Sequence, residues 1–174
     1  MILIISTTNR KNAKSYQVAL HYQGLIKNNG MDAQILTLEH LPQDFAFSAL
    51  YENNGKHPEF NVLKQLVADA QKILFIVPEY NGSFPGVLKT FIDGLGWPNE
   101  LCNKKAALTG ISDGALGGAF ALSHLTDILN YLGCNVFNML VRIPFMKKNF
   151  IDDQVQDTLV ASLIDKQVKT FIQF

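Results

Sequence analysis

The sequence contains few cysteines, no excess of charge of either sign and no long apolar run. Cys102 and Cys134, its 2 cysteines, form no C-x-x-C pair, so the spacing typical of zinc and dithiol redox sites is missing. The 4 histidines show no H-E-x-x-H pattern or other repeated ligand spacing. No apolar segment reaches the roughly 18 residues of a membrane-spanning helix. We therefore expect a soluble protein that needs neither disulfides nor a metal ion.

The charge balance gives no reason to invoke nucleic acid or a membrane surface as a partner. Lys plus Arg and Asp plus Glu each number 15, so the formal net charge is zero. The first residues lack the basic segment and the longer apolar segment of a signal peptide. We expect a cytoplasmic location.

The length of 174 residues predicts one domain over residues 1–174, large enough to bury about 70% of the surface of the unfolded chain. Apolar runs alternate with longer amphipathic segments, which is typical of βαβ units around a parallel sheet. We predict strands at 2–6, 33–38, 73–77, 106–111 and 135–139, and helices at 15–26, 58–70, 87–95 and 119–132. A last helix is expected to start at an Asp152 or Asp153 cap and to reach Phe171. The fold class is thus α/β, a doubly wound five-stranded parallel sheet with helices on both faces. Of the two common strand orders of such sheets, we expect the flavodoxin-like order 2-1-3-4-5.

The segment 41–57 is longer than a usual connection and carries Phe45, Phe47, Leu50 and Tyr51. These side chains could fold back onto the core. They could also line a wall of the active site or form a dimer contact. The sequence leaves these alternatives open.

In a sheet of this order, the loops after the first, third and fourth strands meet in one crevice. The first loop, 7–15, offers hydroxyls, an amide and several cations directly before a helix, a combination that suits a phosphate. Neither G-x-G-x-x-G nor a P-loop lysine motif occurs, so a monophosphate fits better than a dinucleotide or a nucleoside triphosphate.

The second loop, 78–85, is rich in turn formers, and the third loop, 112–118, is rich in glycine. Backbone N–H and C=O groups of the second loop could pair with a flat ligand, with Tyr80 and Asn81 as planar and polar surfaces. An alternative interpretation is a tight turn in which Tyr80 covers the core and Ser83 caps the next helix. The third loop could equally be a flexible turn between strand and helix.

The string PEYNGSFPGVLKTFIDGL, residues 78–95, resembles the signature of the NADPH-dependent FMN reductase family, which includes quinone, azo-dye and chromate reductases. The first loop resembles the family pattern G-S/T-x-R-x-x-S-x-N/T at Thr8, Arg10 and Ser15. Thr7 stands where the family usually has Gly, and Ala13 where it usually has Ser, which predicts weaker flavin retention. The third loop resembles the family's S-x-G-x-x-G-G.

The resemblance implies noncovalent FMN with NAD(P)H as cosubstrate. It implies a reaction that passes a hydride to the flavin and then reduces a quinone, azo, flavin or metal-oxyanion acceptor. The flavin carries the chemistry, so no catalytic side chain is expected, and NAD(P)H and the acceptor would alternate in a ping-pong mechanism. The implied FMN-binding residues are Thr8, Arg10, Ser15, Pro78, Glu79, Tyr80, Asn81, Gly82, Ser112, Asp113 and Gly114.

A homodimer or homotetramer is the assembly that the resemblance implies, with 41–57 and 89–97 as the contact. Two alternatives remain for the function. One is a flavodoxin-type electron carrier without NAD(P)H activity, although such carriers are usually acidic and this chain is neutral. The other is a degenerate family member that binds another phosphorylated ligand.

Overall fold

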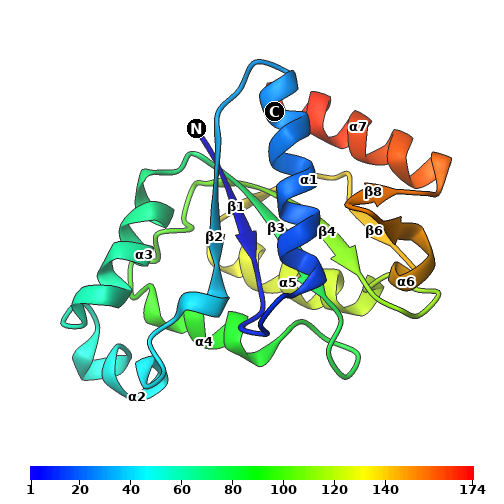
Figure 1. Cartoon of the computed structure of the whole chain (residues 1–174). Coiled ribbons are helices and arrows are strands. Elements are labelled where there is room, and N and C mark those ends of the chain that lie inside the picture. Colours follow the sequence, from blue (N-terminus) through cyan, green and yellow to red (C-terminus); the bar gives the residue numbers. More distant parts are fainter.

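Parallel strands form the centre of the computed structural model, which describes residues 1–174 (Figure 1). Neighbouring strands follow the order β2-β1-β3-β4-β5, and each adjacent pair is parallel. The predicted flavodoxin-like order is therefore confirmed. The strands of the sheet are β1 (Ile2–Ser6), β2 (Ala33–Thr37), β3 (Lys72–Pro78), β4 (Lys105–Ile111), β5 (Asn135–Val136) and β6 (Val141–Ile143). The helices are α1 (Lys14–Asn28), α2 (Phe45–Ser48), α3 (Pro58–Asp69), α4 (Gly86–Gly94), α5 (Ala119–Tyr131), α6 (Met146–Asn149) and α7 (Thr158–Gln173).

Side-chain alternation along β1 divides the core into two layers. Leu3 and Ile5 belong to one buried cluster, and Ile2 and Ile4 to the other, because successive side chains of a strand point to opposite faces. Helices α3, α4 and α5 contribute to the first cluster, and α1 and α7 to the second. Helices thus cover both faces, as predicted. None of them is long and apolar enough to cross a membrane.

The fifth strand is interrupted, which the sequence analysis did not predict. The expected strand at 135–139 is replaced by two short strands, β5 and β6, which both pair with β4. The Gln167 side chain of α7 explains the gap, because its Nε2 donates to the carbonyl oxygens of Leu108, at 3.0 Å, and Met139, at 2.8 Å. The Gln167 side-chain amide therefore bridges β4 and the residues between β5 and β6, where backbone hydrogen bonds of the sheet are interrupted. The sheet has 6 strands.

The predicted cap of the last helix is wrong. Asp152 and Asp153, with φ of 48° and 58°, form the turn of a hairpin between β7 (Phe150–Ile151) and β8 (Gln154–Val155). Two-residue hairpin turns with positive φ favour Asp, Asn and Gly. The helix begins later, and Asp157 is its cap, with Oδ1 accepting from the Val160 N–H at 3.0 Å.

The segment 41–57 divides its aromatic side chains between core and surface. The Phe45 ring stacks on Phe60 with centroids 5.7 Å apart, and Leu50 is also buried. Phe47 and Tyr51 are 87% and 81% exposed. Phe45 and Leu50 therefore pack against the core, whereas Phe47 and Tyr51 do not.

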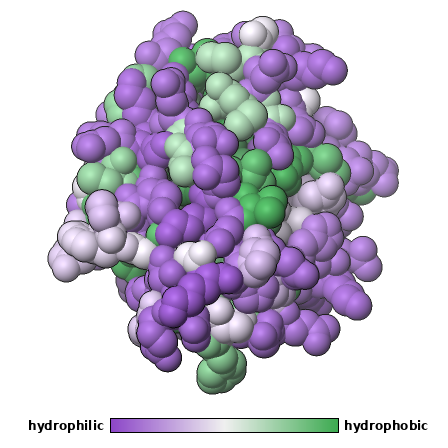
Figure 2. Space-filling view, turned by 90° about the vertical axis from the view of Figure 1, so that its left-hand side faces the viewer, coloured by the Kyte–Doolittle hydropathy of each residue, from purple (hydrophilic) through white to green (hydrophobic).

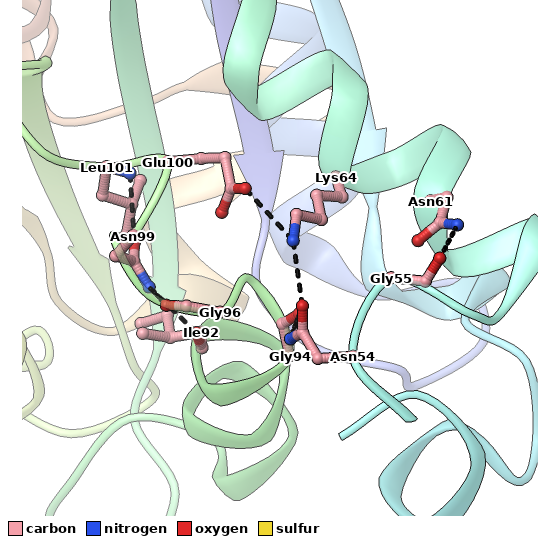
Figure 3. A network of polar contacts seen from close by, with 10 residues as sticks. All are labelled: Asn54, Gly55, Asn61, Lys64, Ile92, Gly94, Gly96, Asn99, Glu100 and Leu101. Carbon is pink, nitrogen blue, oxygen red and sulfur yellow. Dashed lines mark hydrogen bonds and ion pairs between the residues drawn. The ribbon is translucent and has the colours of Figure 1, made fainter. Parts of the chain in front are cut away.

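A polar network holds this segment against the end of α4 (Figure 3). Asn54 Nδ2 donates to the Gly94 carbonyl oxygen at 2.7 Å, and Lys64 Nζ donates to Asn54 Oδ1 at 3.0 Å. The same ammonium lies 3.2 Å from Glu100 Oε1. One lysine of α3 thus joins the segment 41–57 to the chain that follows α4.

Candidate functional site

A cavity of about 510 Å³ opens where β1, β3 and β4 end. The carboxyl ends of parallel strands share one edge of the sheet, so the strand order brings the three predicted loops together. The lining consists of Thr8, Arg10, Lys11, Asn12, Ala13, Lys14, Ser15, Pro78, Glu79, Tyr80, Ile111, Ser112, Asp113, Met146 and Lys147.

The amino terminus of α1 offers unpaired donors to this cavity. The backbone N–H groups of Lys14 and Ser15, the first two helical residues, donate no hydrogen bond within the protein. Ala13 stands at the cap position and has no side-chain oxygen that could accept from them. Asn12, with a left-handed φ of 53°, turns the chain into the helix. Unpaired amides at the start of a 15-residue helix favour an anion.

Two hydroxyls of the first loop are bonded to the strands beneath it. Thr7 is fully buried, and its Oγ1 donates to the Ile76 carbonyl oxygen at 2.9 Å. Ser15 Oγ lies 2.9 Å from Ser6 Oγ. Thr7 does not line the cavity, so the side chain that replaces the family's glycine does not occupy the ligand's space.

The second loop is a tight turn with free amides at its tip. Tyr80 and Ser83 exchange backbone hydrogen bonds of 2.8 Å and 3.0 Å. Asn81 and Gly82, between them, both have positive φ, of 51° and 73°, as a type I′ turn requires. Their own N–H groups donate to no protein acceptor. Two donors are therefore available to a ligand edge.

Tyr80 connects the second loop to the first. Its hydroxyl oxygen lies 2.8 Å from Thr8 Oγ1, a contact between residues 72 positions apart. Thr8 Oγ1 also accepts from the Arg10 N–H at 3.3 Å. The sequence analysis expected Tyr80 to supply a planar surface, whereas the structure also places its hydroxyl at the first loop.

The third loop lies directly on β4. A Cβ added to Gly110 would lie 2.5 Å from the Gly117 carbonyl oxygen, so this approach requires glycine. Asp113 Oδ1 accepts from the Lys147 N–H at 3.2 Å, and Asp113 Oδ2 lies 3.2 Å from Lys147 Nζ. The third loop is thereby joined to α6.

Basic side chains outnumber acidic ones along the cavity. The basic residues are Arg10, Lys11, Lys14 and Lys147, and the acidic residues are Glu79 and Asp113. Asp113 and Lys147 pair with each other, so the surplus comes from the first loop. In a chain without net charge, this local surplus favours an anionic ligand.

Most of the predicted site residues line the cavity. Those that do are Thr8, Arg10, Ser15, Pro78, Glu79, Tyr80, Ser112 and Asp113. Asn81 and Gly82 form the tip of the turn, and Gly114 also lies outside the lining. Sequence reasoning missed Met146 and Lys147, which follow the fifth strand. Their signal was the Met-Lys-Lys run just past a strand whose end reaches the same edge of the sheet.

No group of three or more His, Cys, Asp or Glu side chains is placed to hold a metal ion. Both cysteines are free thiols. Burial raises the pKa of Cys134 to about 12, which keeps this thiol protonated and unreactive.

Comparison with known proteins identifies the family to which this chain is similar. Residues 1–145 match the family model described as NADPH-dependent FMN reductase. The chain is 37% identical over 110 residues to a 2-hydroxy-1,4-benzoquinone reductase of Burkholderia sp, an alignment that covers 56% of this chain and 60% of that protein. It is 31% identical over 116 residues to a quinone reductase of Escherichia coli (strain K12), with 66% and 62% covered. The alignments thus span about three fifths of the length of these curated relatives.

Solved structures share the fold. FerB of Paracoccus denitrificans, a flavoenzyme NAD(P)H:(acceptor) oxidoreductase, superposes with a TM-score of 0.75 at 24% identity, over 99% of this chain and 94% of that one. Flavodoxin 1 of Bacillus cereus gives 0.64 at 14% identity, over 99% and 96%. At such identities the likeness supports the fold alone. The family match, however, includes all three loops around the cavity. The chain therefore belongs to the NADPH-dependent FMN reductase family.

Proposed function

We propose that this protein is an NAD(P)H-dependent oxidoreductase that binds FMN noncovalently in the cavity between the three loops. One observation carries the proposal: an anion-binding helix terminus lines the cavity together with Tyr80, which begins a turn with free amides at its tip. The N–H groups of Lys14 and Ser15 and the cation of Arg10 suit the phosphate. The N–H groups of Asn81 and Gly82 suit the polar edge of a flavin ring.

The size and the donor set of the cavity fit FMN. A volume of about 510 Å³ lies within the range of about 300–1,000 Å³ for pockets that enclose small ligands. We assign the phosphate to Thr8, Arg10 and Ser15, the last through its backbone N–H. The residues assigned to the ring and the ribityl chain are Pro78, Glu79, Tyr80, Asn81, Gly82, Ser112, Asp113 and Gly114.

The residues of this chain bind and orient, and the reaction itself belongs to the cofactor. FMN, when bound, accepts a hydride from NAD(P)H and passes electrons to a second acceptor. Two relatives are named quinone reductases, which favours a quinone over azo compounds, free flavins and metal oxyanions.

We further propose that NAD(P)H and the acceptor occupy one site in turn. The sequence contains no dinucleotide fingerprint that would hold NAD(P)H at a separate site. Initial rates at several fixed quinone concentrations should therefore give parallel double-reciprocal lines. Intersecting lines would indicate a ternary complex and contradict the shared site.

We propose a homodimer or homotetramer that uses the exposed aromatic side chains Phe47, Tyr51 and Trp97, of which Trp97 is 79% exposed. On the side of the molecule where α2 and α3 lie, hydrophobic surface (green) is scattered among hydrophilic surface (purple) (Figure 2). The bond between Asn54 and Gly94 keeps the Tyr51 turn next to the end of α4. Sedimentation should show an oligomer that Trp97→Ala weakens, and a wild-type monomer at micromolar concentration would contradict this assembly.

Consumption of NADPH with and without added FMN tests the proposed function. We expect oxidation of NADPH that depends on FMN and is coupled to reduction of a quinone. Binding of FMN without NADPH oxidation would instead identify a flavodoxin-type electron carrier. Absence of FMN binding would leave a family member that binds another phosphorylated ligand.

A further inference from the structure

The contact between Thr8 and Tyr80 is the one side-chain hydrogen bond between the first and second loops. Thr8 is 1% exposed, whereas Tyr80 is 37% exposed. Both residues line the cavity. The contact, called the hydroxyl pair below, therefore lies between the part of the cavity assigned to the phosphate and the part assigned to the ring.

The hydroxyl pair retains one proton for a ligand, whichever member donates. Each hydroxyl has one proton and two acceptor lone pairs. If Tyr80 donates to Thr8, then Thr8 accepts from both Tyr80 and the Arg10 N–H, and its own proton remains free. If Thr8 donates to Tyr80, the phenolic proton remains free. An ionised phosphate beside Thr8 can only accept, so it favours the first arrangement, in which the Thr8 oxygen is held by Tyr80 and by the Arg10 N–H and the Thr8 proton points to the ligand.

Other hydroxyls around the cavity are less available. Thr7 and Ser112 each donate their proton to a backbone carbonyl oxygen, and Ala13 has no hydroxyl. Ser15 Oγ lies 2.9 Å from Ser6 Oγ of β1, which is fully buried, so this pair is directed toward the sheet. Of the two hydroxyl–hydroxyl contacts at the cavity, the hydroxyl pair is thus the one with a partly exposed member, Tyr80.

We propose that Tyr80 is a positioning residue that selects for a phosphorylated flavin, because its hydroxyl holds the Thr8 hydroxyl where the phosphate binds. This inference rests on the proposed binding of FMN. A phosphate oxygen is an ionised acceptor, and hydrogen bonds to ionised groups are stronger than those between neutral groups. Riboflavin has the same ring and ribityl chain but ends in a neutral hydroxyl. Loss of the Tyr80 hydroxyl should therefore weaken FMN much more than riboflavin.

Tyr80→Phe tests the proposal, because it keeps the aromatic ring and removes only the hydroxyl. The dissociation constants of FMN and riboflavin are measured by quenching of flavin fluorescence. We expect the FMN constant to rise about fivefold or more, with little change for riboflavin. Thr8→Val should give the same pattern. Because Tyr80 acts through Thr8, adding Tyr80→Phe to Thr8→Val should cause no further loss of FMN affinity.

Tyr131→Phe is the matched control, since Tyr131 is 83% exposed on α5 and lies outside the cavity lining. It should change neither constant. Equal losses for FMN and riboflavin in Tyr80→Phe would place the hydroxyl at the ring or the ribityl chain and overturn the inference. Additive losses in the double variant would also overturn it, because Tyr80 would then act independently of Thr8.

The same titrations separate this inference from the proposed function. If the wild type binds FMN more tightly than riboflavin and Tyr80→Phe keeps that preference, only the role of Tyr80 is refuted. If the wild type binds no FMN, the proposed function fails and this inference fails with it.

Discussion

At the scale of single residues, the charge of Arg10 and the directions of the hydroxyl groups in the first loop should determine how the proposed FMN phosphate is held. Arg10 lines the cavity and forms no ion pair with a carboxylate, so its charge is available to a ligand. The unpaired amides of Lys14 and Ser15 add donors without charge. We therefore expect charge and geometry to contribute separately to phosphate affinity.

Arg10→Ala should raise the dissociation constant of FMN about tenfold or more, because a hydrogen bond to a charged group contributes about 1.5–3 kcal/mol and about 1.4 kcal/mol is a factor of ten. The salt dependence of FMN binding should also decrease, since the lost interaction is between charges. Riboflavin affinity should stay the same. Lys166→Ala, which removes an exposed charge on α7, is the control. Equal effects of Arg10→Ala on both flavins would place Arg10 away from the phosphate.

Residue types could be predicted from the sequence, but the directions of side chains could not. The polar and basic composition of residues 7–15 favoured a phosphate site, and the resemblance to the family pattern added Thr8, Arg10 and Ser15 as the residues expected to hold it. Neither gave any sign that Thr7 turns toward the Ile76 carbonyl or that Ser15 Oγ turns toward Ser6. The direction of Thr7 depends on β3, which is distant in the sequence. The direction of Ser15 depends on how α1 packs against β1 in the folded protein.

At the scale of elements, one buried amide joins four parts of the fold. Gln167 of α7 donates to carbonyl oxygens of β4 and of the gap between β5 and β6. Its Oε1 accepts from the Tyr22 hydroxyl of α1 at 2.7 Å and from Thr109 Oγ1 at 3.1 Å. Burial raises the pKa of Tyr22, which keeps its hydroxyl protonated as a donor. The network fixes where α7 docks.

Gln167→Leu should lower the free energy of unfolding by about 3 kcal/mol or more, because each buried polar group left without a partner costs about 1–3 kcal/mol. Chemical denaturation monitored by circular dichroism measures the change. Gln173→Leu, at the exposed end of the same helix, should change it by less than about 0.5 kcal/mol. Similar values for the two variants would show that water or repacking satisfies the network.

The pH dependence of stability should reveal how His21 of α1 packs against Phe150 of β7, whose ring centroid is 6.2 Å away. Burial lowers the pKa of His21 below its ordinary value of 6.5, and Asp153 opposes this effect in part. The unfolded chain then binds the proton more readily, so stability is complete above pH 6.5 and is lost as the pH falls through the folded pKa.

His21→Gln should therefore reduce the decrease in melting temperature between pH 7 and pH 5. His40→Gln, which alters an exposed histidine, should leave the decrease as in the wild type. Melting curves at a series of pH values provide the measurement. Identical slopes for wild type and His21→Gln would show that His21 titrates alike in the folded and unfolded chain.

The positions of helices and strands could be predicted where residues close together in the sequence determine them. The strands β1, β3 and β4 could be predicted because strands buried on both faces are continuous apolar runs. The start of α3 could be predicted because the fixed φ of Pro58 suits the first turn of a helix. The gap in the fifth strand depends on Gln167, which is 28 positions from Met139. No local window contains both residues.

At the scale of the whole molecule, the strand order determines where a ligand can bind. The alternation of strands and helices predicted a doubly wound sheet, of which the order 2-1-3-4-5 is one of two common forms. The structure has this order, which brings the loops after β1, β3 and β4 to one edge. The contribution of α6 was not predictable in the same way. Met146 and Lys147 reach the cavity because β6 pairs in parallel with β4 up to Ile111 and Ile143, so that the chain after β6 leaves the sheet at the same edge.

Anaerobic mixing of the FMN-loaded protein with NADPH, followed by 1,4-benzoquinone, tests the central claim most directly. We predict that the visible flavin absorbance disappears when a stoichiometric amount of NADPH is added, and that it returns when the quinone is added without further NADPH. This result would show that both half-reactions occur on the one bound cofactor. If FMN is bound and its absorbance does not change with NADPH, the protein is not an NAD(P)H-dependent oxidoreductase.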